Sequence, residues 1–158
     1  MSRAPSWHHQ VVTPALLRHA RNIYGAAMRQ ALGKAGFHDI PKNGLYLIGG
    51  MARHEHDVPL GDLVRELRVT KQAASQLVDA LVAGGYLQRA VDENDRRKLV
   101  VTLTRRGRAA AEVQAKAREQ VDAELLARVG ARAVSTTRRT LAALIDLGQP
   151  GENGHRHD

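Results

Sequence analysis

The stretch LGDLVRELRVTKQAASQLVDALVAGGYL, residues 60–87, carries two short apolar stripes at helical spacing. The first stripe consists of Leu60, Leu63, Val64 and Leu67, and the second of Ala74, Leu77, Val78 and Leu81. The residues RVT between them, 68–70, leave room only for a tight turn, and Thr70 is placed to cap the second helix. Two short amphipathic helices joined in this way are the pattern of a helix-turn-helix, although any helical hairpin resembles it.

A β-hairpin is predicted directly after the helix pair. Gly84 and Gly85 end the second helix, because glycine tolerates the left-handed backbone of a helix C-cap. YLQRAV at 86–91 and KLVVTLT at 98–104 have the composition of strands, and they flank the charged tip DENDRR at 92–97. A hairpin in this place is called a wing, so the segment predicts a winged helix-turn-helix.

Amphipathic helices are predicted on both sides of this segment. Apolar residues recur at intervals of one, three and four over residues 14–35, with Thr13 as the expected N-cap and Pro14 at the first helical position. Pro41 is expected to open a second helix that runs through residues 45–54, and HEHDVP at 54–59 to form a loop. Beyond the hairpin, Thr104 is placed to cap a long helix over 105–130, and a last helix covers roughly 134–147.

Composition limits the classes of partner. The chain has 158 residues, a formal charge of +8 and no cysteine, so disulfides, thiolate zinc sites and thiol-based sensing are excluded. The positive charge favours a polyanionic partner, and the 3% of aromatic residues argues against the stacking platforms of single-strand binders. Double-stranded DNA or an acidic protein surface therefore fits better. The absence of a long apolar run or a secretory signal leads us to expect a cytoplasmic protein without a membrane segment.

The surfaces expected to touch DNA lie on the second helix and on the hairpin. With the apolar stripe turned inward, the opposite face near the helix start presents Lys71, Gln72, Ser75 and Gln76, which are residue types that read base edges. Arg96 and Arg97 at the hairpin tip are expected to reach an adjacent minor groove. We hypothesise that Asp92 or Asp95 orients one of these guanidinium groups while another inserts. The alternative readings are an ordinary solvated helix face and a turn that blocks edge-to-edge aggregation.

The order of helix, turn, helix, hairpin and long helix resembles the MarR family of winged helix-turn-helix transcriptional regulators, over nearly the whole chain. The most specific element is the family's wing motif, D-x-R-D-x-R: Asp92, Asp95 and Arg97 match it, while Asn94 stands where the family commonly has Arg. Arg96 or Arg89 is available to replace that contact. The resemblance implies a homodimer on a pseudo-palindromic operator, with repression as the expected outcome.

The resemblance also implies a division of the chain. Residues 1–40 are expected to form an N-terminal arm and dimerisation helix, and residues 41–104 the winged DNA-binding region. Residues 105–148 are expected to form C-terminal dimerisation helices, and residues 149–158 a disordered tail. The expected fold is therefore mainly α with a small β-hairpin wing.

Many members of the family respond to a small aromatic ligand held between the dimerisation helices and the winged region. Trp7, His19, Tyr24 and Met28 are the candidate contacts, with core packing as the alternative role for Tyr24 and Met28. The histidines of HEHD, His54 and His56, are of a residue type that binds transition metals. We favour a solvated loop there, because no second ligand group stands at a recognisable spacing, so no metal or cofactor is predicted.

Other classes of protein remain to be separated by experiment. An enzyme is not expected, because the sequence lacks a nucleophile motif, a P-loop and a paired metal motif. The main alternative is a winged-helix module that contacts proteins, or an architectural DNA binder without ligand sensing. The function predicted from the sequence is a DNA-binding repressor released by a small ligand.

Overall fold

A computed structural model of the chain describes residues 10–53, 58–59, 61–62, 65, 70–92, 95–97 and 99–148. Its elements are the helices α1 (Thr13–Lys34), α2 (Gly44–Met51), α4 (Lys71–Ala83), α5 (Arg105–Val129) and α6 (Ala131–Asp146), and the strands β1 (Val58–Pro59), β2 (Leu87–Val91) and β3 (Leu99–Leu103). The chain forms two compact units, residues 1–119 and residues 120–158. The prediction of a mainly helical fold with a small antiparallel wing is confirmed.

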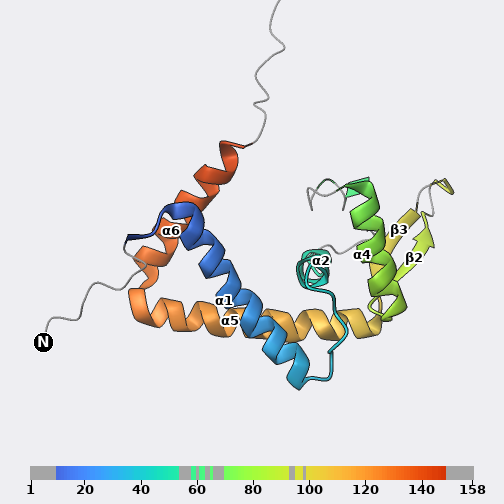
Figure 1. Ribbon diagram of the computed structural model, residues 1–158, viewed down its shortest axis with the longest axis horizontal. Helices are drawn as coiled ribbons and strands as arrows, with labels where there is room; N and C mark the ends of the chain where they lie inside the picture. The colour runs from blue at the N-terminus through green and yellow to red at the C-terminus, as the bar shows by residue number, and fades with distance from the viewer. Residues whose placement is uncertain are drawn as a thin grey trace, which may run out of the picture. The chain divides into compact units, whose positions relative to one another are not determined.

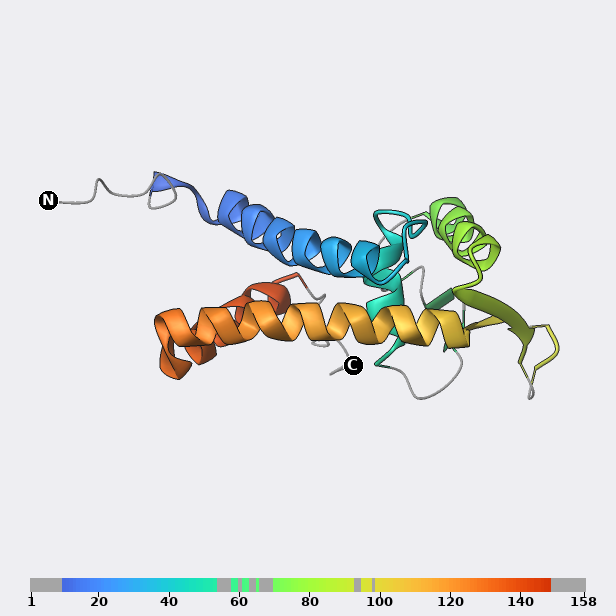
Figure 2. The same cartoon turned by 90° about the horizontal axis from the view of Figure 1, so that it is seen from below.

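The first unit holds the sheet and the apolar core. β3 is the central strand of an antiparallel sheet in the order β1-β3-β2, with Leu87 opposite Leu103 and Val58 opposite Val101. Figure 1 shows α4 alongside β2 and β3, and Figure 2 shows the hairpin leading away from the first turn of α5. The core gathers apolar side chains from every element of the unit: Met28, Leu32, Leu45, Leu47, Ile48, Met51, Val58, Val78, Leu81, Tyr86, Leu87, Val101, Leu103, Ala110, Ala111 and Ala117.

The stripe predicted for α4 is the one that packs into this core. Ala74, Val78 and Leu81 are fully buried, and Leu77 packs partly buried against them. Burying apolar side chains on one face holds the helix on the sheet and turns its polar face outward. Of the preceding helix, residues 61, 62 and 65 are described as helical, and its predicted stripe lies outside the described residues.

Two predicted helix starts are corrected. α1 begins at Thr13, so its N-cap is Val12, whose side chain makes no capping hydrogen bond, and Thr13 and Pro14 occupy the first two helical positions. Pro at the second position leaves the helix intact because the first N–H groups have no helical partner in any case. α2 begins at Gly44 and not at Pro41; the Pro41 carbonyl accepts a hydrogen bond from the Gly44 N–H in a turn before the helix.

Two further differences concern the sheet and the last helix. Val58 and Pro59, predicted within a loop, form strand β1 on the outer edge of β3, where a missing proline N–H is tolerated. The wing hairpin is thus part of a three-stranded sheet. α6 begins at Ala131, earlier than the predicted start near Val134, since Gly130 at φ +81° makes the corner after α5 and lets the next helix start at once.

The second unit, described to Gly148, consists of the last turns of α5 and the helix α6. Asp122 and Arg138 form an ion pair of 3.9 Å between these two helices. No residue of α6 is buried. Its apolar residues Leu144 and Ile145, and Leu125, Leu126 and Val129 of α5, remain exposed. Within the described residues of this unit, these apolar side chains therefore form a surface that the unit itself leaves uncovered.

Candidate nucleic-acid interface

The start of α4 is fixed by a capping hydrogen bond, as the sequence predicted. The Thr70 hydroxyl oxygen accepts from the Ala73 N–H at 3.1 Å, and Thr70 itself has the extended backbone of an N-cap. Just beyond the cap, Lys71, Gln72 and Gln76 are exposed, while Ser75 is half-buried. The helix therefore presents a cation and two amides from one short, rigid segment.

The hairpin tip is organised by its two aspartates. The Asp92 carboxylate accepts from the Asp95 N–H at 2.9 Å, and the Asp95 carboxylate accepts from the Arg97 N–H at 3.0 Å. The second bond spans two residues and forms an Asx turn, and both are local side-chain-to-backbone hydrogen bonds that fix the backbone of a loop. Arg96 and Arg97 are exposed, and Asn94 lies outside the described residues.

Arg89 is engaged elsewhere. On β2 it forms an ion pair of 2.5 Å with Asp79 of α4. Both side chains are partly exposed, so the ion pair itself contributes little to the stability of the fold. The pair does tie the hairpin to the helix that it accompanies, and it makes Arg89 a weaker substitute for the wing contact expected at Asn94 than the neighbouring Arg96.

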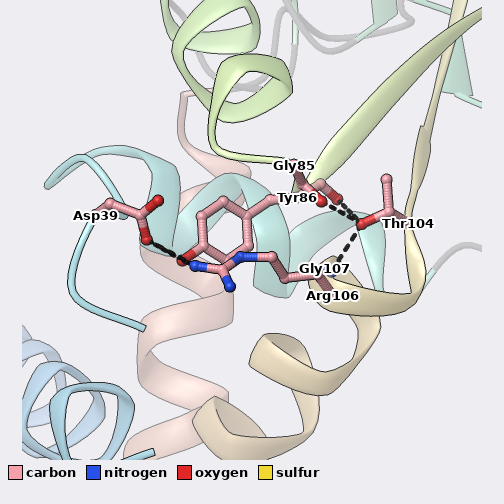
Figure 3. Close-up of polar contacts among 6 residues, drawn as sticks. All are labelled: Asp39, Gly85, Tyr86, Thr104, Arg106 and Gly107. Atoms are coloured by element: carbon pink, nitrogen blue, oxygen red, sulfur yellow. Dashed lines mark hydrogen bonds and ion pairs between the residues drawn. The ribbon is translucent and has the colours of Figure 1, made fainter. Parts of the chain in front are cut away.

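Thr104 joins the base of the hairpin to α5 (Figure 3). Its hydroxyl lies 2.6 Å from the Gly85 carbonyl oxygen, 3.1 Å from that of Tyr86, and accepts from the Gly107 N–H at 3.0 Å. The predicted cap of α5 is thereby confirmed, with two added partners. Gly107 is required there, because a Cβ at this position would lie 2.1 Å from the Tyr86 carbonyl oxygen.

A polar cluster that the sequence did not suggest lies beside this joint. We call Asp39, Tyr86 and Arg106 the clamp (Figure 3). The buried Tyr86 donates its hydroxyl proton to Asp39, and the Arg106 guanidinium donates to the Tyr86 hydroxyl at 2.9 Å and to Asp39 at 3.1 Å. The clamp links the residues before α2, the start of β2 and the start of α5.

Electrostatics within the clamp follow from this geometry. The hydrogen bond from Tyr86 and the nearby Arg106 charge lower the pKa of Asp39 below its ordinary value of 3.8, against a smaller opposing effect of burial. Burial and the neighbouring Asp39 raise the pKa of Tyr86. Asp39 is therefore ionised and Tyr86 neutral at physiological pH, and the two keep the hydrogen bond that joins them.

The predicted ligand contacts are dispersed. Met28 is buried in the core, Tyr24 packs partly buried against it, His19 is exposed and Trp7 lies outside the described residues. His54 and His56 also lie outside them. In the portion of the chain that the structure covers, no group of three or more histidine, aspartate and glutamate side chains could hold a metal, and no helix is long and apolar enough to cross a membrane.

Known proteins provide an independent comparison. The MarR family model matches residues 38–98, which run from the clamp through the hairpin tip. No curated protein matches the chain. Many solved structures share the fold. The S. aureus MepR–DNA complex is 18% identical, with a TM-score of 0.72, covering 88% of this chain and 99% of that one.

Two further structures extend the comparison. FabT of Streptococcus pneumoniae in complex with DNA is 20% identical, with a TM-score of 0.72, covering 85% of this chain and 93% of that one. Wild-type MarR from E. coli is 21% identical, with a TM-score of 0.62, covering 85% and 97%. Residues 38–98 thus match the MarR family model, and the chain shares the fold of these solved structures.

Proposed function

We propose that the protein is a cytoplasmic, dimeric transcription regulator that binds a pseudo-palindromic site on double-stranded DNA and represses until a small ligand releases it. The observation that best supports the proposal is that two exposed polar surfaces lie in the same unit. The capped α4 exposes Lys71, Gln72 and Gln76, and the accompanying hairpin exposes Arg96 and Arg97. MepR and FabT, which share this fold, have been solved with DNA.

The α4 surface supplies the chemistry of base reading. Lysine reaches the O6 and N7 acceptors of guanine, glutamine pairs with both acceptor and donor of adenine, and Thr70, Ser75 and the backbone N–H groups of the first turn suit a phosphate. The rigid cap and the buried stripe behind it hold these groups in one direction, as groove recognition requires.

The hairpin supplies the second contact. The hydrogen bonds that the Asp92 and Asp95 carboxylates accept from backbone N–H groups fix the backbone from which Arg96 and Arg97 project, so less conformational entropy is lost when an arginine enters a minor groove. We expect Arg97→Ala to weaken specific binding strongly and to reduce the salt dependence by about one phosphate-equivalent. An unchanged affinity and salt slope for this variant would refute the wing contact.

The proposal of a dimer is supported by the uncovered apolar residues at the ends of the chain. Val12, Leu16 and Ile23 of the α1 region are exposed, as are six large apolar residues of the second unit: Leu125, Leu126, Val129, Leu144, Ile145 and Leu147. Scattered exposed leucines are ordinary, but a helix with no buried residue needs a partner to be stable. We propose that residues 1–40 and 105–148 supply dimerisation helices around the winged region 41–104.

Selection of bound fragments from a random duplex library tests the function directly. We expect a palindrome whose half-sites are centred about one DNA turn, roughly 10 base pairs, apart. A Lys71→Ala, Gln76→Ala variant should lose the enriched sequence while keeping weak, salt-sensitive binding. Failure to enrich any sequence would favour a protein-interaction module, and enrichment without symmetry would favour an architectural binder. Sedimentation at the same protein concentration checks the dimer.

A further inference from the structure

The buried face of α5 is built almost entirely from small side chains. The helix buries Gly107, Ala110, Ala111, Gln114 and Ala117, and Val113 packs partly buried beside them. Packed helices keep a fixed direction when the side chains of one form ridges that fit into the grooves of the other. Glycine and alanine form only shallow ridges, so this packing gives α5 little resistance to a small tilt or roll.

Two polar joints near the first turn of α5 supply the direction that the packing leaves open. At the first, the Thr104 hydroxyl lies within hydrogen-bond distance of the carbonyl oxygens of Gly85 and Tyr86. One attachment point fixes where a helix begins but not where it points. The clamp is the second point, since Arg106 donates to the Tyr86 hydroxyl at 2.9 Å and to Asp39 at 3.1 Å (Figure 3).

The clamp is anchored in the winged region by the buried Tyr86. Its backbone N–H donates to the Leu81 carbonyl oxygen at 2.9 Å, so Tyr86 is bonded directly to the last turn of α4. The Arg106 guanidinium lies 4.7 Å from the centre of the Tyr86 ring and 5.5 Å from that of Phe37. Arg106 therefore ties the first turn of α5 to the end of the helix that presents Lys71 and Gln76.

We propose that Asp39, Tyr86 and Arg106 are positioning residues that fix the direction of α5 relative to α4, and through it the half-site spacing that a dimer accepts. The part on spacing rests on the proposed function, because it requires a dimer joined through the ends of the chain. Residues 105–119 of α5 extend over about 21 Å. A tilt of about 10° at the first turn moves residue 119 by about 4 Å, roughly the 3.4 Å rise of one base pair.

Distances between two spin labels, measured by pulsed electron spin resonance on the full chain without DNA, test the direction of α5. The chain has no cysteine, so Ala80→Cys on α4 and Lys116→Cys on α5, both exposed, take labels at these two sites alone. An excess of unlabelled chain leaves only the distances within one chain. We expect Tyr86→Phe and Arg106→Ala each to broaden the distance distribution about 1.5-fold or more, because the smooth helix face then leaves the tilt free.

Val58→Ala is the matched control for a general loss of stability. It removes apolar volume from the same core, at strand β1, and takes part in no clamp contact. We expect it to destabilise the fold and to leave the width of the distance distribution unchanged. Unchanged widths in both clamp variants would overturn the proposal. It would also be overturned if Val58→Ala broadened the distribution as much as Tyr86→Phe does.

The effect on spacing is measured on DNA. Half-sites of the selected operator are placed at the selected spacing and at one base pair more or fewer. The unmodified chain and Val58→Ala should prefer the selected spacing by about tenfold or more, and Tyr86→Phe by about threefold or less. Because Tyr86→Phe changes no charge, its affinity for one isolated half-site should stay unchanged.

A full spacing preference in Tyr86→Phe would overturn the link between the clamp and the DNA site. If no DNA sequence is enriched at all, the proposed function fails, and the spin-label distances still decide whether the clamp fixes the direction of α5.

Discussion

Removing the Tyr86 hydroxyl should separate the contribution of the clamp from that of the core around it. Tyr86→Phe keeps the buried ring but deletes one hydrogen bond to Asp39 and one from Arg106. A hydrogen bond to a charged group is worth about 1.5–3 kcal/mol net. Because Asp39 and Arg106 remain about half-exposed and keep their own 3.1 Å ion pair, we expect the lower part of that range, about 1.5–2 kcal/mol.

Urea unfolding followed by circular dichroism, at one fixed protein concentration, measures this loss. Tyr46→Phe is the matched control, since in the described part of the chain the Tyr46 hydroxyl makes no hydrogen bond, and we expect a change below about 0.5 kcal/mol. If Tyr86→Phe is no more destabilising than Tyr46→Phe, the clamp contributes nothing to stability and the reasoning fails.

The same variant should alter the response to acid. The pKa of Asp39 is lowered in the folded protein, chiefly by Tyr86, so the stability it adds is present above the unfolded pKa near 4 and is lost as the pH falls through the lower folded pKa. The free energy of unfolding of the unmodified protein should therefore fall more steeply between about pH 4 and pH 2 than that of Tyr86→Phe. Equal slopes would contradict the assigned cause of the shift.

Five further substitutions, at four positions, have defined outcomes in the same unfolding assay. Gly107→Ala should cost about 1–3 kcal/mol or more, because its Cβ would lie 2.1 Å from the Tyr86 carbonyl oxygen, whereas Gly33→Ala, in open space, should be neutral or stabilising. Thr70→Ala should cost about 1 kcal/mol and Thr70→Ser much less, since serine keeps the capping oxygen; equal losses would argue against the cap. Gln114→Met should stabilise by about 0.5–2 kcal/mol, because the buried Gln114 amide nitrogen has no partner among the described residues, and a loss would show that the amide is paired.

The parts of the fold that follow local rules were predictable from the sequence. The stripe of α4, its Thr70 cap, the Thr104 cap of α5 and the left-handed Gly85 each depend on neighbours within a few residues. The two-residue strand β1 does not, because Val58 and Pro59 become a strand only through pairing with Val100 and Val101 of β3. A segment of two residues is too short to show a periodicity that would predict this strand pairing.

The clamp could not be predicted from the sequence, for a similar reason. Asp39 and Tyr86 are 47 residues apart, and Tyr86 and Arg106 are 20 apart, so only the folded chain brings them together. Each residue alone reads as an ordinary member of a loop, a strand end or a basic helix start. Glycine is a poor helix former, and the need for it at position 107 follows only from the fold, in which the Tyr86 carbonyl oxygen occupies the space of a side chain on Gly107.

In the wing, the aspartates of the motif act differently from what the sequence predicts. The sequence suggested that Asp92 or Asp95 orients an arginine by direct pairing of carboxylate and guanidinium. The hydrogen bonds of the turn give both carboxylates a role through the backbone, since they accept the N–H groups of Asp95 and Arg97. A fixed backbone sets the direction in which Arg97 leaves the chain, while its guanidinium stays exposed. Acidic residues close to a DNA contact are then compatible with binding, because their hydrogen bonds to backbone N–H groups hold the turn that presents the cation.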